Sequence, residues 1–241
     1  MRDVLSFPFN SEEVIVVASD NSGAIGEKEQ DSVKVPYETV SYYSFRVAVM
    51  ECLSAGAEPF AVTLQNFCGD NAWDRLLKGI KRGAGELGLM DLQITGSTES
   101  NFTLHQSAVG LSVLGKKQGK VHTEPIIYTN QANIAVIGSP LVGGELIERE
   151  AEAAPLKLFQ VINTIDEVLT LPIGSKGILN ELNGLFSNMT FKDNDLEGDL
   201  DLWKSAGPST CFAAVYPNKK AEEIRKLAGR YFHILKEGYE K

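Results

Sequence analysis

The chain has 241 residues, with 43% hydrophobic and 23% charged side chains and a formal net charge of −9. This composition is typical of one large or two small globular domains and excludes a disordered chain. The acidic balance argues against a nucleic-acid partner, because such proteins present a basic stripe. A few local cations still suffice to bind a nucleotide.

The sequence carries no sign of a membrane or secretory segment. No apolar run approaches the roughly 18 residues that a membrane-spanning helix needs, and residues 1–10 lack the apolar core of a signal peptide. The cysteines are scattered and show neither disulfide nor zinc spacing; they are Cys52, Cys68 and Cys211. We therefore expect a cytoplasmic protein without a membrane partner.

The first half of the chain predicts the order β, α, β, α, β, β. Residues 14–19 are apolar and β-branched, as in a buried strand, and the polar residues 27–34 are expected to form a loop. Apolar residues then recur at the spacing of one helix face, at Val40, Tyr43, Val47, Met50 and Ser54. The elements expected next are a strand at 57–67, a helix at 73–87, and strands at 91–98 and 107–117.

The second half reads as a further domain of similar make-up. Residues 115–123 are polar and glycine-bearing, which predicts a linker between an N-terminal domain, 1–118, and a C-terminal domain, 124–241. The elements expected in the second domain are strands at 132–139, 210–216 and 231–238, and helices at 145–152, from Pro155, at 177–186 and at 219–229. The acidic residues 191–203 are expected to be exposed. The mixed order predicts an α+β fold.

Two carboxylates stand out in the first domain. Asp20 follows the first apolar strand, and with Asn21 and Ser22 it places a carboxylate, an amide and a hydroxyl at one sheet edge. Carboxylate oxygen is a hard ligand that suits magnesium, whereas an Asx turn is the simpler interpretation. Glu51 lies beside the apolar stripe of the helix, where a partly buried carboxylate needs a metal, a basic neighbour or solvent.

Two glycine-bearing turns have the chemistry of phosphate sites. Thr95–Ser100, "TGSTES", places hydroxyls and a carboxylate after a strand, and the backbone amides of such a turn cradle phosphate in other proteins; an ordinary loop is the alternative. Gly174–Gly177, "GSKG", opens a helix, so its free N–H groups favour an anion and Lys176 adds a charge. A plain N-cap is equally compatible, and the Walker A spacing is absent.

The order of these motifs resembles a known superfamily. "SDNSGAIG", "LSAGAEP", "LLKGIKRGAGELG" and "ITGSTES" follow one another as in the N-terminal domain of the aminoimidazole ribonucleotide synthetase superfamily, which includes thiamine monophosphate kinase, selenophosphate synthetase and a hydrogenase-maturation dehydratase. "PIGSKGILNEL" and the segment 207–238 resemble its C-terminal domain. The resemblance implies a PurM-like two-domain fold: an N-terminal mixed sheet with helices that dimerises into a β-barrel, and a smaller, here shortened, α+β C-terminal domain.

The resemblance also implies ATP and magnesium as cofactors. Asp20 matches a metal-binding Asp, Glu51 stands where the superfamily usually has Asp, and Asp3 corresponds loosely to an N-terminal acidic pair. Ser97 replaces the Asp or Glu of the superfamily's glycine turn, and Glu99 is a candidate substitute. The implied roles are catalytic for Asp20 and Lys176; metal-binding for Asp20, Glu51 and Glu99; and nucleotide-binding for Asn21, Ser22, Gly96, Ser97, Thr98, Gly174 and Ser175.

The departures from the superfamily's pattern reduce the number of reactions that the resemblance allows. The trimmed chain lacks the long N-terminal tail that selenophosphate synthetase uses, so the simplest reaction left is phosphoryl transfer from ATP to a small hydroxyl acceptor. The chain is most similar to a short branch, found in some Gram-positive bacteria, that phosphorylates α-ribazole, the nucleoside of the cobalamin lower ligand. This predicts a homodimeric kinase with a nucleoside-like substrate. The alternatives are a non-catalytic nucleotide-binding regulator, which the serine at position 97 favours, and an enzyme like thiamine monophosphate kinase or an ATP-dependent ribonucleotide synthetase.

Overall fold

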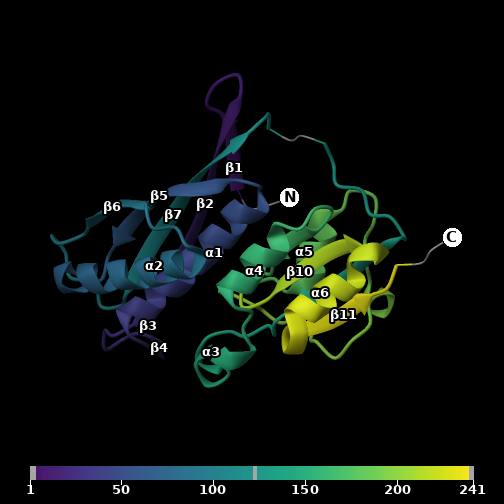
Figure 1. Cartoon of the computed structure of the whole chain (residues 1–241). Coiled ribbons are helices and arrows are strands. Elements are labelled where there is room, and N and C mark those ends of the chain that lie inside the picture. The colour runs from purple at the N-terminus through teal and green to yellow at the C-terminus, as the bar shows by residue number, and fades with distance from the viewer. Residues whose placement is uncertain (1–3, 122–123, 239–241) are drawn as a thin grey trace. The chain divides into compact units, whose positions relative to one another are not determined.

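The computed structural model describes residues 4–121 and 124–238 (Figure 1). These residues form two compact units that divide near residue 121. The predicted linker is partly strand, because Gly115–Gln118 belong to the last strand of the first unit, and its residues His122 and Thr123 lie outside the described residues.

The first unit is built on a five-stranded mixed sheet in the order β1-β2-β7-β5-β6. β7 is antiparallel to both β2 and β5, and β6 is parallel to β5. Consequently β2, β5 and β6 run in one direction and end at the same edge of the sheet. The strands are β1 (Val4–Pro8), β2 (Glu13–Gly23), β5 (Glu58–Asn66), β6 (Gln93–Thr98) and β7 (Ala108–Gln118).

The structure corrects the predicted end of the first long strand. β2 continues through Asp20, Asn21 and Ser22 to Gly23, and all of them pair with β7. The polar residues are therefore strand residues and do not form an Asx turn. β1, which precedes β2, was not expected from the sequence either, since Phe7 and Pro8 alternate poorly with their polar neighbours.

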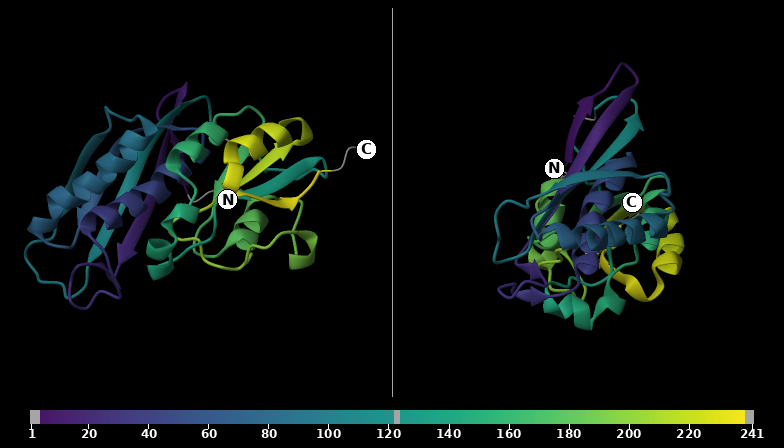
Figure 2. Two further views of the ribbon diagram at one scale, coloured as in Figure 1. Left: turned by 60° about the horizontal axis from the view of Figure 1, so that its bottom comes forward. Right: turned by 90° about the vertical axis from the view of Figure 1, so that its left-hand side faces the viewer.

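Two helices cover one face of this sheet (Figure 2). α1 (Tyr37–Ser54) packs on β2 and β7, and α2 (Trp73–Leu87) packs against α1. α1 is buried around most of its circumference, while Tyr43 and Val47 of the predicted stripe are only partly buried. The helices approach closely at Gly79, where a Cβ would lie 2.1 Å from the carbonyl oxygen of Glu38. A short 3-10 turn, Asp70–Ala72, precedes α2.

The opposite face of the sheet is more open. Leu5 and Phe7 of β1 pair with Val17 and Ile15 of β2 on that face. Leu5 is 63% exposed and Phe7 42% exposed. The segment that was expected to be a plain loop after β2 contains a short parallel pair, β3 (Ile25–Gly26) with β4 (Val33–Lys34).

The second unit is built on a four-stranded antiparallel sheet in the order β11-β8-β10-β9. Its strands are β8 (Ala132–Ile137), β9 (Leu169–Pro172), β10 (Phe212–Pro217) and β11 (Phe232–Lys236). Its helices are α3 (Gly144–Glu148), α4 (Leu156–Asn163), α5 (Ile178–Leu185) and α6 (Ala221–Ala228). β9 was not predicted; it is a short edge strand, the place where Pro172 is tolerated.

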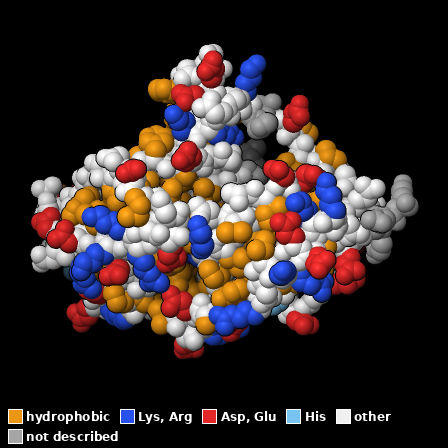
Figure 3. All heavy atoms as spheres, viewed as in Figure 1, with side chains coloured by type: hydrophobic (Ala, Val, Ile, Leu, Met, Phe, Trp, Pro, Cys, Tyr) orange, Lys and Arg blue, Asp and Glu red, His pale blue; other side chains and the backbone are white. Residues whose placement is uncertain are grey.

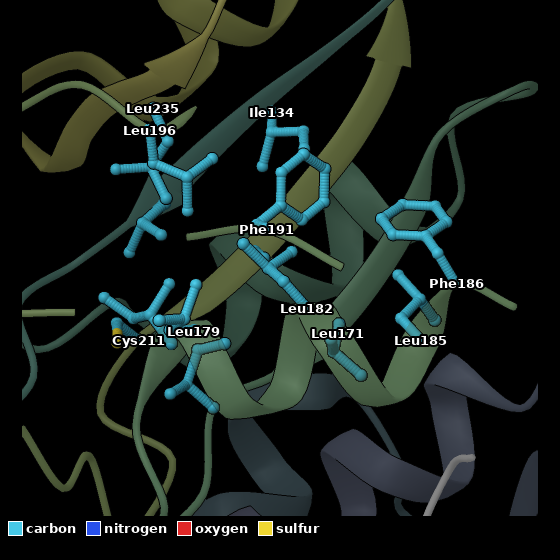
Figure 4. Close-up of a cluster of buried hydrophobic side chains, with 14 of the residues drawn as sticks. Ile134, Leu171, Leu179, Leu182, Leu185, Phe186, Phe191, Leu196, Cys211 and Leu235 are labelled. Carbon is cyan, nitrogen blue, oxygen red and sulfur yellow. The ribbon is translucent and has the colours of Figure 1, made fainter. Parts of the chain in front are cut away.

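Apolar side chains fill both faces of this second sheet. On one face, Phe159 of α4 meets Phe212 of β10 edge to face, with ring centroids 5.0 Å apart. On the other, leucines of α5 pack with Phe191 and Ile134 (Figure 4). The α+β fold class predicted from the sequence is thus confirmed.

The surface agrees with the overall charge. On the face shown in Figure 3, lysine and arginine side chains alternate with acidic ones over the described residues and do not form the stripe that a nucleic-acid site presents. None of the helices that the structure describes combines the length and apolar character of a membrane span.

Candidate functional site

The registers of the N-terminal sheet bring the predicted residues into adjacent rows at one edge. Each row crosses β2, β7, β5 and β6 in that order. The rows are Asp20, Leu111, Leu64 and Gly96; then Asn21, Gly110, Gln65 and Ser97; then Ser22, Val109, Asn66 and Thr98. Sequence segments that are far apart therefore present polar groups at one end of one sheet.

Residues that share a row can still lie far apart, because a row crosses four strands. Strands lie about 4.8 Å apart, so β2 and β6 are about 14 Å apart across β7 and β5. Asp20 and Glu99, which follows β6, therefore belong to opposite ends of the edge. Within the described parts of the chain, no three His, Cys, Asp or Glu side chains gather as a metal centre.

Asp20 occupies the helix-covered face of β2. Val14, Val16 and Ala18 precede it on the same face and are fully buried under α1. Burial raises the pKa of Asp20 to about 6, and hydrogen bonds from Ser44 of α1 and the Asn21 backbone oppose that rise. A half-buried carboxylate with a raised pKa at a strand end is a strong candidate for a functional group.

Glu51 lies further along the same helix as Ser44. The separation of seven residues puts both on one side of α1, about 10 Å apart along its axis. The Oε2 atom of Glu51 is buried, so this carboxylate faces the protein interior. Asp20 and Glu51 thus share one side of α1 at different levels.

The predicted glycine turn is part of a strand. Gly96, Ser97 and Thr98 all lie within β6, and a Cβ at Gly96 would lie only 2.0 Å from the Leu64 carbonyl oxygen. The glycine is thus explained by close strand packing. Ser97 is exposed on the open face, whereas Thr98 is on the helix-covered face and receives a hydrogen bond from Asn66.

Glu99 closes the turn that follows β6. Its Oε1 accepts hydrogen bonds from the backbone N–H groups of Asn101 at 2.7 Å and Phe102 at 3.3 Å, while its own N–H donates to the Asn66 carbonyl. The carboxylate therefore stabilises a local turn, and a metal at Glu99 would have to share it with these donors.

Asn66 is a residue of this edge that sequence reasoning missed. It is 1% exposed at the end of β5. Its amide donates to the Gly69 carbonyl at 2.9 Å and to Thr98 Oγ1 at 3.1 Å, and its oxygen accepts from the Cys68 N–H at 2.8 Å. The available signal was the same as for Asp20: a polar residue that ends an apolar strand parallel to β2.

The segment between β3 and β4 is anchored at the same edge. Asp31 accepts the Ser107 N–H and hydroxyl, each at 2.7 Å, and the Lys28 N–H at 2.8 Å. Burial favours the protonated form, but these hydrogen bonds outweigh it and lower the pKa of Asp31. Lys28 Nζ donates to the Phe67 carbonyl at 3.0 Å, which brings a cation to the end of β5.

The second predicted phosphate turn lies in the other unit, between β9 and α5. Ser175 and Lys176 are exposed, and Gly177 has a positive φ of 83° at the start of α5. A Cβ at Gly174 would lie 3.1 Å from Oε1 of Glu181. This carboxylate lies beside the turn and competes with any anion that approaches it. Asp3 lies outside the described residues.

Comparisons with known proteins identify the fold. A scan of protein-family models finds no match, and a search of curated proteins finds none. T. maritima PurL complexed with AMPPCP matches with a TM-score of 0.60 and 12% identity over 96% of this chain and 42% of PurL. Thiamine-monophosphate kinase from Stenotrophomonas maltophilia K279a has a TM-score of 0.62 and 12% identity, covering 98% of this chain and 89% of that one. AaThiL complexed with AMPPCP and TMP has a TM-score of 0.62 and 11% identity over 98% and 85% of the two chains.

At these identities the similarity establishes the fold alone. The chain has the α+β fold of these proteins. It spans less than half the length of PurL but most of the length of the thiamine-monophosphate kinase and of AaThiL.

Proposed function

We propose that the chain is an ATP- and magnesium-dependent kinase that transfers the γ-phosphoryl group to a hydroxyl of a small molecule. The fold is shared with a thiamine-monophosphate kinase and with structures complexed with the ATP analogue AMPPCP. The observation that carries the proposal is Asp20, a desolvated carboxylate that begins the polar rows at the common end of β2, β5 and β6.

Asp20 supplies a carboxylate oxygen at this edge, the ligand type that Mg²⁺ prefers. Glu51 lies about two turns of α1 away from Ser44, the partner of Asp20, so its proposed role as a second ligand rests on the resemblance of the motifs. When bound, magnesium neutralises the charge of the transferring phosphate. Asn21 and Ser22 supply hydrogen-bonding groups next to Asp20, and Gly96, Ser97 and Thr98 form the β6 end of the same edge. These roles remain predictions.

For the second unit we propose a supporting role in binding the nucleotide or acceptor. Gly174 and Ser175 would offer backbone N–H groups, and Lys176 would place its exposed ammonium near phosphate. Since phosphoryl transfer depends mainly on positioning and charge neutralisation, no strong nucleophile is required of the chain.

The proposed acceptor is α-ribazole, giving α-ribazole 5′-phosphate, and the proposed assembly is a homodimer. The acceptor rests on the resemblance of the motifs to the α-ribazole kinase branch. The dimer is supported by the open face of the N-terminal sheet, where Leu5 and Phe7 are exposed. Light scattering on the purified chain measures its mass directly, and a monomer at micromolar concentration would contradict the dimer.

A phosphoryl-transfer assay tests the function. The full chain is incubated with ATP and Mg²⁺ and with α-ribazole, thiamine monophosphate or a panel of nucleosides, and ADP and phosphorylated product are measured. ADP formation that needs both Mg²⁺ and one acceptor is the expected result. ADP without any acceptor-dependent product would contradict the kinase assignment.

A nucleotide-binding regulator is the second candidate. It is favoured by Ser97 in place of an acidic ligand and by the turn-bound carboxylate of Glu99. Such a protein would show a rise in melting temperature with AMPPCP, because a ligand of the native state stabilises it, without ADP release on any acceptor. A ribonucleotide synthetase would release ADP only with an amidine-forming substrate.

A further inference from the structure

A pocket in the second unit lies outside every residue assigned above. Its volume is about 420 Å³, within the usual size of small-molecule sites. Residues of α5 form one wall, and the acidic segment between α5 and β10 forms the rest. The lining residues used below are Leu179, Asn183, Phe191, Lys192, Asp193 and Trp203.

The ring of Trp203 is exposed to solvent, but hydrogen bonds fix both its indole nitrogen and its backbone. The residue is 63% exposed. Its indole Nε1 donates to Asp193 Oδ2 at 3.2 Å, and its backbone N–H donates to Asp201 Oδ1 at 3.0 Å. Its backbone packs so tightly on Gly177 that a Cβ there would lie 2.7 Å from the Trp203 carbonyl. An exposed ring with a defined orientation is a platform for stacking.

Hydrogen bonds tie together the two residues of the opposite wall. Asn183 Nδ2 donates to the Phe191 carbonyl at 3.1 Å, and Asn183 Oδ1 accepts the Phe191 N–H at 2.7 Å. Phe191 is 2% exposed and meets Tyr128 edge to face, with ring centroids 5.2 Å apart. These contacts hold Asn183 and Phe191 in place on one side of an open depression.

The charge around the pocket restricts its ligand. The segment that contributes Asp193 and Trp203 is acidic, with Asp193, Asp195, Glu197, Asp199 and Asp201 against Lys192 alone between residues 191 and 203. Such a field disfavours an anion and favours a neutral or cationic group. The lining itself carries Lys192 beside Asp193, so it is the acidic surroundings that favour a neutral or cationic aromatic base over a phosphate.

We propose that this pocket binds a planar, nitrogen-containing aromatic ring, neutral or cationic, stacked on Trp203. The inference rests on the proposed function in that the ring is the base of the nucleoside-like acceptor. The pocket begins at Leu179, directly beside the Gly174–Gly177 turn, and the Leu179 N–H donates to the Leu202 carbonyl at 3.0 Å. Trp203 is then a specificity residue, which selects the acceptor by its ring.

Binding of 5,6-dimethylbenzimidazole to the full chain, measured by calorimetry without ATP, tests the proposal. Trp203→Ala should weaken binding about tenfold or more, since stacking on one aromatic side chain carries much of the affinity for a base. Leu227→Ala removes another exposed apolar side chain, on α6 and outside the pocket, and should leave binding unchanged. Benzoate, a planar anion, should not bind.

Two further variants keep the test decisive. Trp203→Phe retains a ring and should lose less affinity than Trp203→Ala, and it serves if the alanine variant does not fold. Asp193→Asn removes the charge that faces the indole and should weaken a cationic ring more than a neutral one. Equal affinity of wild type and both Trp203 variants, no binding to wild type, or benzoate binding as well as dimethylbenzimidazole would each overturn the proposal.

The outcomes separate this inference from the kinase assignment. Suppose that ring binding depends on Trp203 but no nucleoside is phosphorylated. The proposed ring site would then be supported, and the kinase assignment would be contradicted. Conversely, the Trp203→Ala variant could transfer phosphate with an unchanged KM for the acceptor. That result would support the kinase assignment and contradict a role of the pocket in acceptor recognition.

Discussion

The two ends of the helix-covered face of β2 differ in one respect. At the first end, Val14, Val16 and Ala18 are fully buried under α1. At the second end, the same face of the same strand carries Asp20 and then Ser22. Apolar burial stabilises the first end, whereas burial of the Asp20 carboxylate raises its pKa and costs stability. Under the proposed function, a bound cation would offset this cost.

Two polar side chains at this edge of the sheet differ in how well they are hydrogen-bonded. Asn66 is almost completely buried but its amide is satisfied by three hydrogen bonds. Asp20 is less buried, and its hydrogen bonds do not offset its desolvation. Asn66 is therefore part of the structure of this edge, and Asp20 is the group that a bound cation would relieve.

The largest change in stability is expected when a polar side chain is placed at the buried, apolar end of β2. Val16→Asn places an amide at a position that is 0% exposed and should lower the free energy of unfolding by about 4 kcal/mol. Chemical denaturation measures it. A loss below about 1 kcal/mol would mean that the two ends do not differ.

Removal of the satisfied amide should have a smaller effect. Asn66→Ala leaves the Cys68 N–H and the Gly69 carbonyl without their side-chain partner and should cost about 2 kcal/mol in unfolding free energy. The same denaturation experiment applies. If Asn66→Ala were neutral, the hydrogen bonds at this edge would not hold β5 to β6.

Asp20→Asn should act in the opposite direction. The folded pKa of Asp20, about 6, lies above its ordinary value of 3.8, so the ionised carboxylate opposes folding above pH 6. In metal-free buffer at pH 7.5 the variant should be more stable by about 2 kcal/mol. The gain should shrink as pH falls through 6 and vanish below about pH 4, as melting curves across this range would show. A destabilised variant at pH 7.5 would contradict the desolvation of Asp20.

The smallest effect is expected at the surface near this end. Arg75 and Glu27 form an ion pair whose side chains are 42% and 37% exposed. Exposed pairs contribute little, so Arg75→Ala should cost about 0.5 kcal/mol, less at high salt. A loss above about 2 kcal/mol would show that the segment between β3 and β4 depends on this pair.

Sequence reasoning located most elements because their patterns are local. The bounds of α2 follow from the spacing of its apolar residues and from Gly88, which has a positive φ of 74° as expected of a C′ residue. The end of β2 was wrong, because its polar residues are held by pairing with β7, and pairing partners cannot be read from a single strand. β9 escaped prediction for the same reason.

The candidate site could be predicted only in part. Asp20 was found because it follows an apolar run, and its raised pKa needed the packing of α1 to be known. Gly96 was assigned to phosphate binding, but its closeness to Leu64 is a property of strand packing. The pocket at Trp203 was missed, because it joins α5 to a segment that the sequence presents only as acidic.

The most direct test of the account compares wild type with Asp20→Asn in the phosphoryl-transfer assay, with Ser19→Ala as the matched neighbour on the open face of β2. With ATP, Mg²⁺ and α-ribazole, we expect product from wild type and Ser19→Ala and at least about a hundredfold loss in Asp20→Asn, while the melting temperature of Asp20→Asn is equal to or above that of wild type. Asp20→Asn that keeps wild-type turnover would contradict the assignment of this edge as the site of phosphoryl transfer.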